Sequence, residues 1–330
     1  MGYVGSVLVP YLASLGTYEL YGFDAGYFEK DLTGPCPEYF LAKQYRGDLR
    51  EFPKALLKNM DAVIHLGALS CDDLSAEIIN QVNYQATVRL AELAKQAGVL
   101  RFVFASSCDL YGGAGDGVPR SEQDEINPLT LCSKSKALAE KALEKLASPD
   151  FQISTLRFAT ACGPSPRLRL DLALNFFIAT AMTEQKITIQ GDGSLMQAFI
   201  HVRDMARAME WAVNRSGDDY LMLNVGSDLW NYALLELAQE CADLIPGLLI
   251  ERDLNNLKNL KNLKTPASYQ VDFKKFRELA PYHQPIKTMD QTVESLSRLC
   301  QPHQPKFYRG LGGFSADFKD ALSPLKLTLA

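Results

Sequence analysis

The chain has 330 residues, of which 47% are hydrophobic and 22% charged, and its formal net charge is −5. This composition is typical of a globular protein, and the length allows one large domain or two smaller ones. The acidic balance, without a concentrated basic block, argues against a nucleic-acid surface. No apolar run approaches the length of a membrane span and no signal peptide precedes the first motif, so we expect no membrane association.

The cysteines and histidines argue against a metal centre. The 7 cysteines are an odd number without a CxxC pair, and the 4 histidines are scattered. We interpret the cysteines as reduced thiols in a cytoplasmic protein, because a disulfide framework or a zinc site would need paired spacings.

The first motif lies at the start of the chain. Gly2 and Gly5 precede an amphipathic helix start at residues 7–12. Free N–H groups and the helix dipole favour an anion at such an N-terminus, although GxxG alone is weak evidence of a nucleotide loop. The next strand, residues 19–24, ends in Asp24, about twenty residues after the glycine turn. A carboxylate there accepts hydrogen bonds from a ribose and favours NAD over NADP; a plain turn aspartate is the alternative.

Strands and helices then alternate. Residues 61–68 form an apolar strand that contains His65, which we interpret as a packed structural histidine. A long helix follows from Asn83, with Gly98 as its C-cap. Further strands are expected at residues 153–158, 223–226 and 269–272, and a helix at 234–245. The alternation predicts a doubly wound parallel sheet.

The stretch 102–136 is the most informative part of the chain. The apolar run 101–105 has the length and composition of a buried parallel strand, and it ends in Ser106 and Ser107. In an open α/β sheet, ligands bind at the carboxyl ends of the strands. A helix then opens after Pro128 and Thr130 and carries Lys136.

These motifs resemble the active-site half of the extended short-chain dehydrogenase/reductase family, the nucleotide-sugar epimerases and dehydratases. That family has SSxxxYG at the strand end and PYxxSK on the helix. The position of the family's catalytic tyrosine, four residues before the lysine, holds Cys132. Further blocks, such as GDLR and FIHVRD, extend the resemblance over roughly residues 1–300. The matching active-site residues are Ser106, Ser107, Tyr111, Gly112, Pro128, Ser135 and Lys136.

The resemblance implies a Rossmann-type doubly wound parallel sheet with a smaller C-terminal substrate lobe. The NAD-binding domain would comprise residues 1–164 plus about 199–228, and the substrate lobe about 165–198 plus 229–330. Gly2 and Gly5 match the last two glycines of the family's loop, whereas the first glycine and the first strand are absent. We expect the true start to lie upstream of Met1. The implied NAD-binding residues are Gly2, Tyr3, Val4, Gly5, Asp24, Asp48, Leu49, Leu66, Gly67, Ala68 and Lys136.

The implied substrate is a nucleoside-diphosphate sugar. The guanidiniums of Arg167 and Arg169 could clamp a diphosphate bidentately; a solvated helix start is an alternative of equal weight. Gln197 stands where the family has an arginine that contacts phosphate. The implied substrate residues are Ser107, Arg167, Arg169, Asn175 and Gln197.

In this family the tyrosine phenolate removes a proton from a sugar hydroxyl while the ring carbon gives hydride to the nicotinamide. A thiol has a lower reference pKa than a phenol, about 8.5 against about 10. However, Cys132 ends a ring's length short of that phenol, and a misplacement of about 1 Å can cost roughly 100-fold. A water relay or Tyr111 would have to substitute. Asp109 stands where the 4,6-dehydratases have a glutamate, and it could abstract a proton α to a keto group; bonding of the turn backbone is the alternative. The expected catalytic residues are Ser107, Lys136, Asp109 and Cys132.

The sequence leaves three functions open. The first is an NAD-dependent epimerase or dehydratase of a nucleoside-diphosphate sugar, acting on an already oxidised keto-sugar with Asp109 as acid/base. The second is a keto-sugar reductase. The third is a catalytically impaired relative that binds NAD or pairs with an active paralogue. Cys132, Cys162 and Gln197, together with the missing strand, favour it. The resemblance also implies a homodimer through the helices after Asn83 and Cys132.

Overall fold

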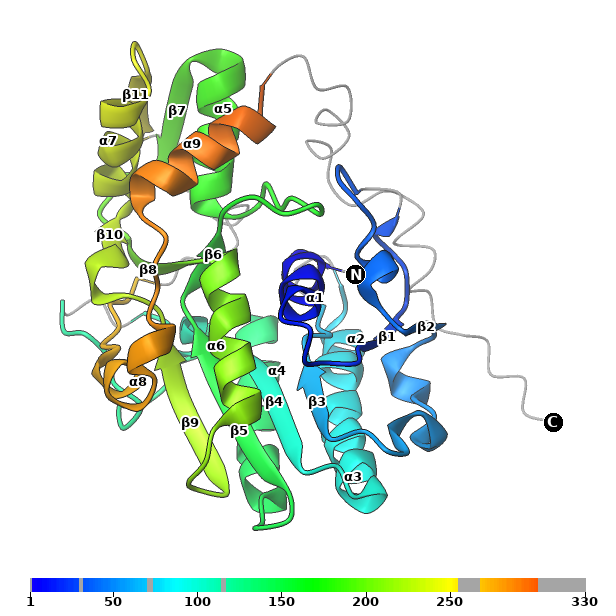
Figure 1. Cartoon of the computed structure of the whole chain (residues 1–330). Helices are drawn as coiled ribbons and strands as arrows, with labels where there is room; N and C mark the ends of the chain where they lie inside the picture. Colours follow the sequence, from blue (N-terminus) through cyan, green and yellow to red (C-terminus); the bar gives the residue numbers. More distant parts are fainter. Residues whose placement is uncertain (1, 30–31, 70–73, 114–116, 255–267, 302–330) are drawn as a thin grey trace.

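The computed structural model describes residues 2–29, 32–69, 74–113, 117–254 and 268–301 (Figure 1). Its helices are α1 (Gly5–Ser14), α2 (Ala76–Ile79), α3 (Thr87–Ala97), α4 (Leu131–Leu146), α5 (Ala173–Glu184), α6 (Val202–Asn214), α7 (Leu234–Leu244), α8 (Lys274–Leu279) and α9 (Met289–Leu299). Its strands are β1 (Tyr21–Asp24), β2 (Lys43–Arg46), β3 (Ala62–His65), β4 (Arg101–Ser107), β5 (Gln152–Phe158), β6 (Thr160–Cys162), β7 (Lys186–Gln190), β8 (Met196–His201), β9 (Tyr220–Val225), β10 (Asn231–Ala233) and β11 (Leu249–Asp253).

The predicted parallel sheet is present, and it consists of two parts. Strands β3, β4, β5 and β9 form one parallel sheet in that order, and β1 and β2 form a separate parallel pair. Within the described residues no strand pairs with the free edges of β1 and β3. In the doubly wound order 3-2-1-4-5-6, the gap between β1 and β3 corresponds to the place of the first strand.

Helices cover both faces of the larger sheet. Figure 1 shows α1 and α6 on the near face and α3 and α4 on the far face. The core cluster on the near face combines apolar residues of α1 and α6 with those of β4, β5 and β9. The cluster on the far face combines residues of α3, α4 and the same strands. A doubly wound α/β fold is therefore confirmed.

A third core cluster lies apart from the sheet. It is built from α5, α7 and α9, together with residues of β7 and β8. Figure 1 shows these elements beyond the carboxyl ends of the strands of the larger sheet. The small sheets β10–β8–β6 and β11–β7 belong to this region.

Local patterns placed most elements correctly. Gly98 ends α3 with a positive φ of 81°, as expected for a C-cap. The expected strand at 269–272 is wrong, because Val271 makes only an isolated bridge to Arg120. Tyr269, two residues before Val271, donates its backbone N–H to the carbonyl of Met196. In the part of the chain that the structure describes, no helix is both long enough and apolar enough to cross a bilayer.

Candidate active site

Lys136 reaches the carboxyl end of β4, where Ser107 lies. The pairing of β3 with β4 ends at His65 and Phe104, so Ala105 extends past the end of β3. Lys136 Nζ donates a hydrogen bond of 2.9 Å to the carbonyl oxygen of Ala105. Ala105 and Ser107 lie on the same face of the strand, because alternate residues of a strand point the same way. Burial lowers the pKa of the Lys136 ammonium.

Cys132 occupies the first turn of α4, one turn before Lys136. Its Sγ is half-buried and lies 3.9 Å from Nδ2 of Asn83. Burial lowers the pKa of Arg169. Interactions with Asp171, Tyr3 and Cys132 outweigh burial, so the pKa of Arg169 is raised overall. The Cys132 thiol also raises the pKa of Lys136, so it interacts electrostatically with both cations.

Asp109 lies beside the N-terminus of α4. The 3-10 turn η6 (Cys108–Tyr111) follows β4, and its cap is Ser107, whose Oγ accepts the backbone N–H of Asp109 at 3.2 Å. Asp109 Oδ2 lies 3.5 Å from Oγ1 of Thr130, the N-cap of α4. The carboxylate thus faces the same helix end as Cys132, where the helix dipole favours negative charge.

Tyr111 cannot substitute for the missing phenol, which corrects one of the two routes that the sequence suggested. Only 1% of its surface is exposed, and its hydroxyl lies 2.8 Å from Oδ1 of Asn224 and 2.9 Å from the carbonyl of Ser121. The hydroxyl also accepts a hydrogen bond from Arg157. Burial raises the pKa of Tyr111 well above that of a free phenol. Its hydroxyl is engaged inside the protein and does not reach a ligand.

The N-terminus of α1 has the geometry of an anion site. Within the described residues, the first hydrogen bond of this turn runs from the N–H of Ser6 to the carbonyl of Gly2. The first amides of a helix lack acceptors within the helix itself. A Cβ placed on Gly2 would meet nothing within 4 Å, and one on Gly5 would meet Leu66 at 3.8 Å. This open helix terminus fits the pyrophosphate of a dinucleotide. Val4 is the N-cap, whereas the Tyr3 side chain is buried.

The acidic residues assigned to the cofactor differ in how they are engaged. Asp24 ends β1, and its Oδ1 accepts the backbone N–H of Gly26 at 2.7 Å. Asp48 forms an ion pair with Arg50 at 2.6 Å, and the hydrogen bonds from Arg50 lower the pKa of Asp48. Leu49 begins the 3-10 turn η3 (Leu49–Glu51) next to this pair.

Leu66, Gly67 and Ala68 directly follow β3. A Cβ on Gly67 would lie 3.3 Å from Cε1 of His65, so a larger residue there would press on the imidazole. Nε2 of His65 lies 2.8 Å from Oγ1 of Thr87, and burial lowers the pKa of His65 to about 4. The imidazole is neutral and packed near neutral pH.

The two arginines expected to clamp a diphosphate point to different neighbours. The guanidinium of Arg167 lies over the ring of Phe28, 4.3 Å from its centroid. Arg169 forms an ion pair with Asp171 at 2.6 Å. It also interacts electrostatically with Tyr3 and Cys132. Of the two, only Arg169 interacts electrostatically with Cys132 of α4 among the contacts of the described residues.

Asn175 and Gln197 are both buried. Oδ1 of Asn175 accepts the N–H of Gly163 at 2.9 Å, and its Nδ2 donates to the carbonyl of Arg169 and to the Tyr3 hydroxyl. Gln197 lies in β8, pairs with Tyr232 of β10 and is 6% exposed. Direct contact of either side chain with a substrate stays a prediction.

Sequence reasoning missed a buried ion pair beneath the site. Glu140, one turn after Lys136 on α4, accepts three hydrogen bonds from Arg157 of β5, at 3.1, 3.2 and 2.7 Å. It also accepts the hydroxyl of Ser106, the neighbour of Ser107. A charged residue at helical spacing from Lys136, on the buried face of α4, was the signal that could have revealed it.

The chain has a Rossmann-type α/β fold, and in such folds ligands bind at the carboxyl edge of the sheet. A sequence model of the "NAD dependent epimerase/dehydratase family" matches residues 1–226. The chain belongs to this family, whose members are enzymes with NAD as cofactor.

Individual relatives agree with this assignment. The chain is 27% identical over 253 residues to the low-salt glycan biosynthesis protein Agl12 of Haloferax volcanii, covering 74% of this chain and 80% of that protein. It is 29% identical over 272 residues to a UDP-glucose 4-epimerase of Streptococcus mutans, covering 72% and 78%. The solved structure of MoeE5 in complex with UDP-glucuronic acid and NAD superposes with a TM-score of 0.75 at 27% identity, covering 90% of this chain and 96% of that one.

Proposed function

We propose that this protein is an NAD-dependent enzyme that epimerises or dehydrates a nucleoside-diphosphate sugar, and that its substrate is already a keto-sugar. The observation that carries the proposal is the position of Asp109, beside Ser107 and the N-terminus of the helix that bears Lys136. Carbon-acid chemistry α to a carbonyl needs a base and no net hydride transfer. The enzyme therefore depends little on the phenol that Cys132 replaces.

In this reaction the Asp109 carboxylate removes the proton from the carbon next to the keto group, and the electron pair moves into an enolate. Ser107 donates a hydrogen bond to the oxygen on which the negative charge develops. A proton taken from solvent on the opposite face gives the epimer, and Asp109 then releases its own proton to solvent. Transfer of the Asp109 proton to a β-hydroxyl instead expels water and gives the dehydrated sugar. A positioned general base contributes about 10²–10⁴-fold to such a step.

NAD, when bound, would supply a hydride acceptor for unoxidised sugars, whereas with a keto-sugar it would only help to shape the sugar site. The amides at Gly2–Gly5 would hold its pyrophosphate and the Asp24 carboxylate its ribose, while Leu66–Ala68 would line one wall. Arg169 would attract the substrate diphosphate, and Arg167, Asn175 and Gln197 would shape the segment around it.

The test begins with the purified full-length chain. NAD binding is measured by calorimetry, and 4-keto nucleoside-diphosphate sugars are incubated in D₂O. Deuterium incorporation next to the carbonyl, followed by NMR, reports proton abstraction directly. UDP-glucose and UDP-glucuronic acid serve as unoxidised comparison substrates.

Asp109→Asn should lower the rate of deuterium incorporation at least about 100-fold. Asp192→Asn is the matched control, because the Asp192 carboxylate only caps a surface turn through Ser194. Unchanged exchange in Asp109→Asn would contradict the role of this carboxylate.

Cys132 favours a second candidate, a non-catalytic relative that binds NAD or pairs with an active paralogue. This candidate predicts that NAD binds while neither keto-sugars nor unoxidised sugars are converted. Reduction of a keto-sugar by added NADH in the same assays would instead support the reductase. Absence of NAD binding would exclude both enzyme functions.

A homodimer and a cytoplasmic location complete the proposal. Helices α3 and α4 pack side by side, and Leu131 and Leu138 of α4 are 38% and 47% exposed. In the described residues every cysteine is a free thiol, which supports a reducing compartment. Leu138→Glu should shift the sedimentation equilibrium toward monomer, whereas Leu249→Glu, on exposed β11, should not.

A further inference from the structure

Tyr3 connects the head of α1 with a segment that lies far away in sequence. Its hydroxyl donates a 2.6 Å hydrogen bond to the carbonyl of Gly163 and accepts a hydrogen bond from Asn175. Its backbone carbonyl accepts the hydroxyl of Ser165 at 2.8 Å. Only 4% of Tyr3 is exposed. Phenylalanine would fill the same space, so the hydroxyl matters for these bonds and not for packing.

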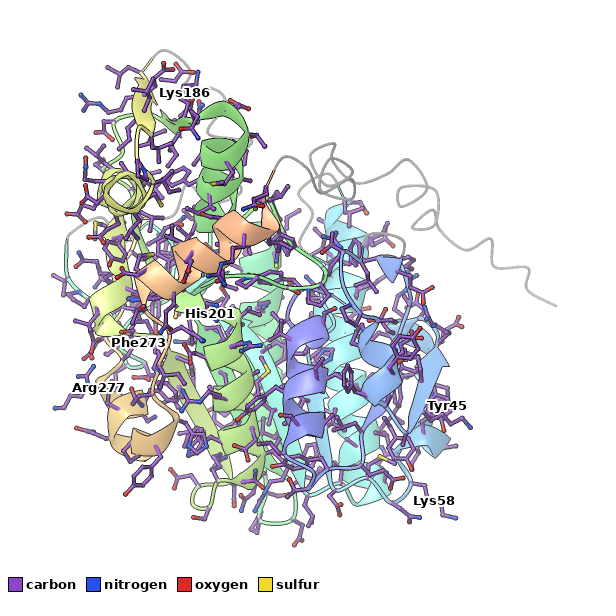
Figure 2. The ribbon with its side chains drawn as sticks, turned by 45° about the horizontal axis from the view of Figure 1, so that its top comes forward. Tyr45, Lys58, Lys186, His201, Phe273 and Arg277 are labelled. Atoms are coloured by element: carbon purple, nitrogen blue, oxygen red, sulfur yellow. The ribbon has the colours of Figure 1, made fainter. Side chains whose placement is uncertain are left out.

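The segment 163–171 depends on this cluster for its own conformation. Gly163 has a φ of +100°, and a Cβ there would lie 2.5 Å from Nε2 of His201. His201, which is labelled in Figure 2, is the N-cap of α6. Asn175 binds the N–H of Gly163 and the carbonyl of Arg169, so one amide fixes both ends of the segment.

A second contact joins the same segment to the loop after β1. The backbone N–H and the hydroxyl of Thr33 both donate to the carbonyl of Pro166, at 2.7 and 3.0 Å. The guanidinium of Arg167 lies over Phe28. Both loops that face the proposed nucleotide site, at the head of α1 and after β1, therefore hold the segment that carries Arg167 and Arg169.

We propose that Tyr3 is a positioning residue that couples the nucleotide loop to the arginine-bearing segment 163–171, so that a dinucleotide bound at the head of α1 orders this segment. The inference rests on the proposed function, because the dinucleotide is its first ligand. Coupling between two sites is reciprocal, so a ligand held by Arg169 would in turn tighten the nucleotide site.

Hydrogen–deuterium exchange of the full chain, with NAD as the probe, tests the coupling without a known sugar substrate. In the absence of NAD, Tyr3→Phe should speed amide exchange in peptides covering 163–171 about fivefold, the factor that corresponds to the net ~1 kcal/mol of one hydrogen bond. In the wild type, NAD should slow exchange both at the head of α1 and at 163–171. In Tyr3→Phe, NAD should still slow exchange at α1 but have little effect on 163–171.

Ser165→Ala removes the second link and should act in the same direction. Tyr18→Phe is the matched control, because the Tyr18 hydroxyl joins the N-terminal region to Glu210 of α6 and not to segment 163–171. Equal NAD protection of 163–171 in the wild type and Tyr3→Phe would overturn the coupling. Protection at α1 alone in the wild type would also overturn it. If NAD protects neither region of the wild type, the proposed function fails first and the coupling with it.

Discussion

Glu140→Gln should destabilise the protein strongly, because it breaks an ion pair that the fold almost fully removes from water. Only 5% of each side chain, Glu140 and Arg157, is exposed. Removing one partner of such a pair leaves an uncompensated buried charge and costs about 3–5 kcal/mol. The Ser106 hydroxyl loses its charged acceptor as well.

The assay is urea denaturation followed by circular dichroism, with the midpoint and the slope compared between variants. Glu294→Gln is the matched control, because Glu294 pairs with Arg298 one helical turn away at 63% and 75% exposure. That pair should contribute only about 0.3–0.5 kcal/mol. The double variant Glu140→Leu/Arg157→Met should be less destabilised than Glu140→Gln, since it leaves no unpaired charge. A loss below about 1 kcal/mol in Glu140→Gln would refute the reasoning.

Further predictions concern pH, backbone strain and the missing phenol. Burial lowers the pKa of His65 and of His201 from 6.5 to about 4. The stability that is present above pH 6.5 should therefore fall as the pH drops toward 4, by up to about 3 kcal/mol per histidine. A His65→Gln variant whose melting temperature falls with pH as steeply as that of the wild type would contradict this. Gly163→Ala should lower the melting temperature more than Gly217→Ala. Both glycines have a positive φ, but only at position 163 would the new Cβ press against His201. Equal losses of melting temperature would show that this contact does not destabilise the protein. Cys132→Tyr should raise the formation of reduced nicotinamide from UDP-glucose or UDP-glucuronic acid about 100-fold, measured by absorbance, and no change would show that the phenol is not what limits hydride transfer.

The sequence by itself determined the order of the elements and the residues at the strand ends. The apolar run that ends in Ser106 and Ser107 became β4, and Thr130 became the N-cap of α4. These features follow from periodicity and capping, which act over a few neighbouring residues. The family motif also predicted that Lys136 would approach the end of β4, and in the structure Lys136 donates a hydrogen bond to the carbonyl of Ala105.

Only the tertiary structure decided which polar groups are free to act. Tyr111 matched a motif, yet contacts from Arg157 and Asn224 bury its hydroxyl. Arg167 and Arg169 are near neighbours in sequence, but Arg167 lies over Phe28 of a distant loop whereas Arg169 pairs with Asp171 of its own segment. Tyr3 binds Gly163 across 160 positions of chain. Such contacts depend on how distant segments pack, and no local pattern of side chains carries that information.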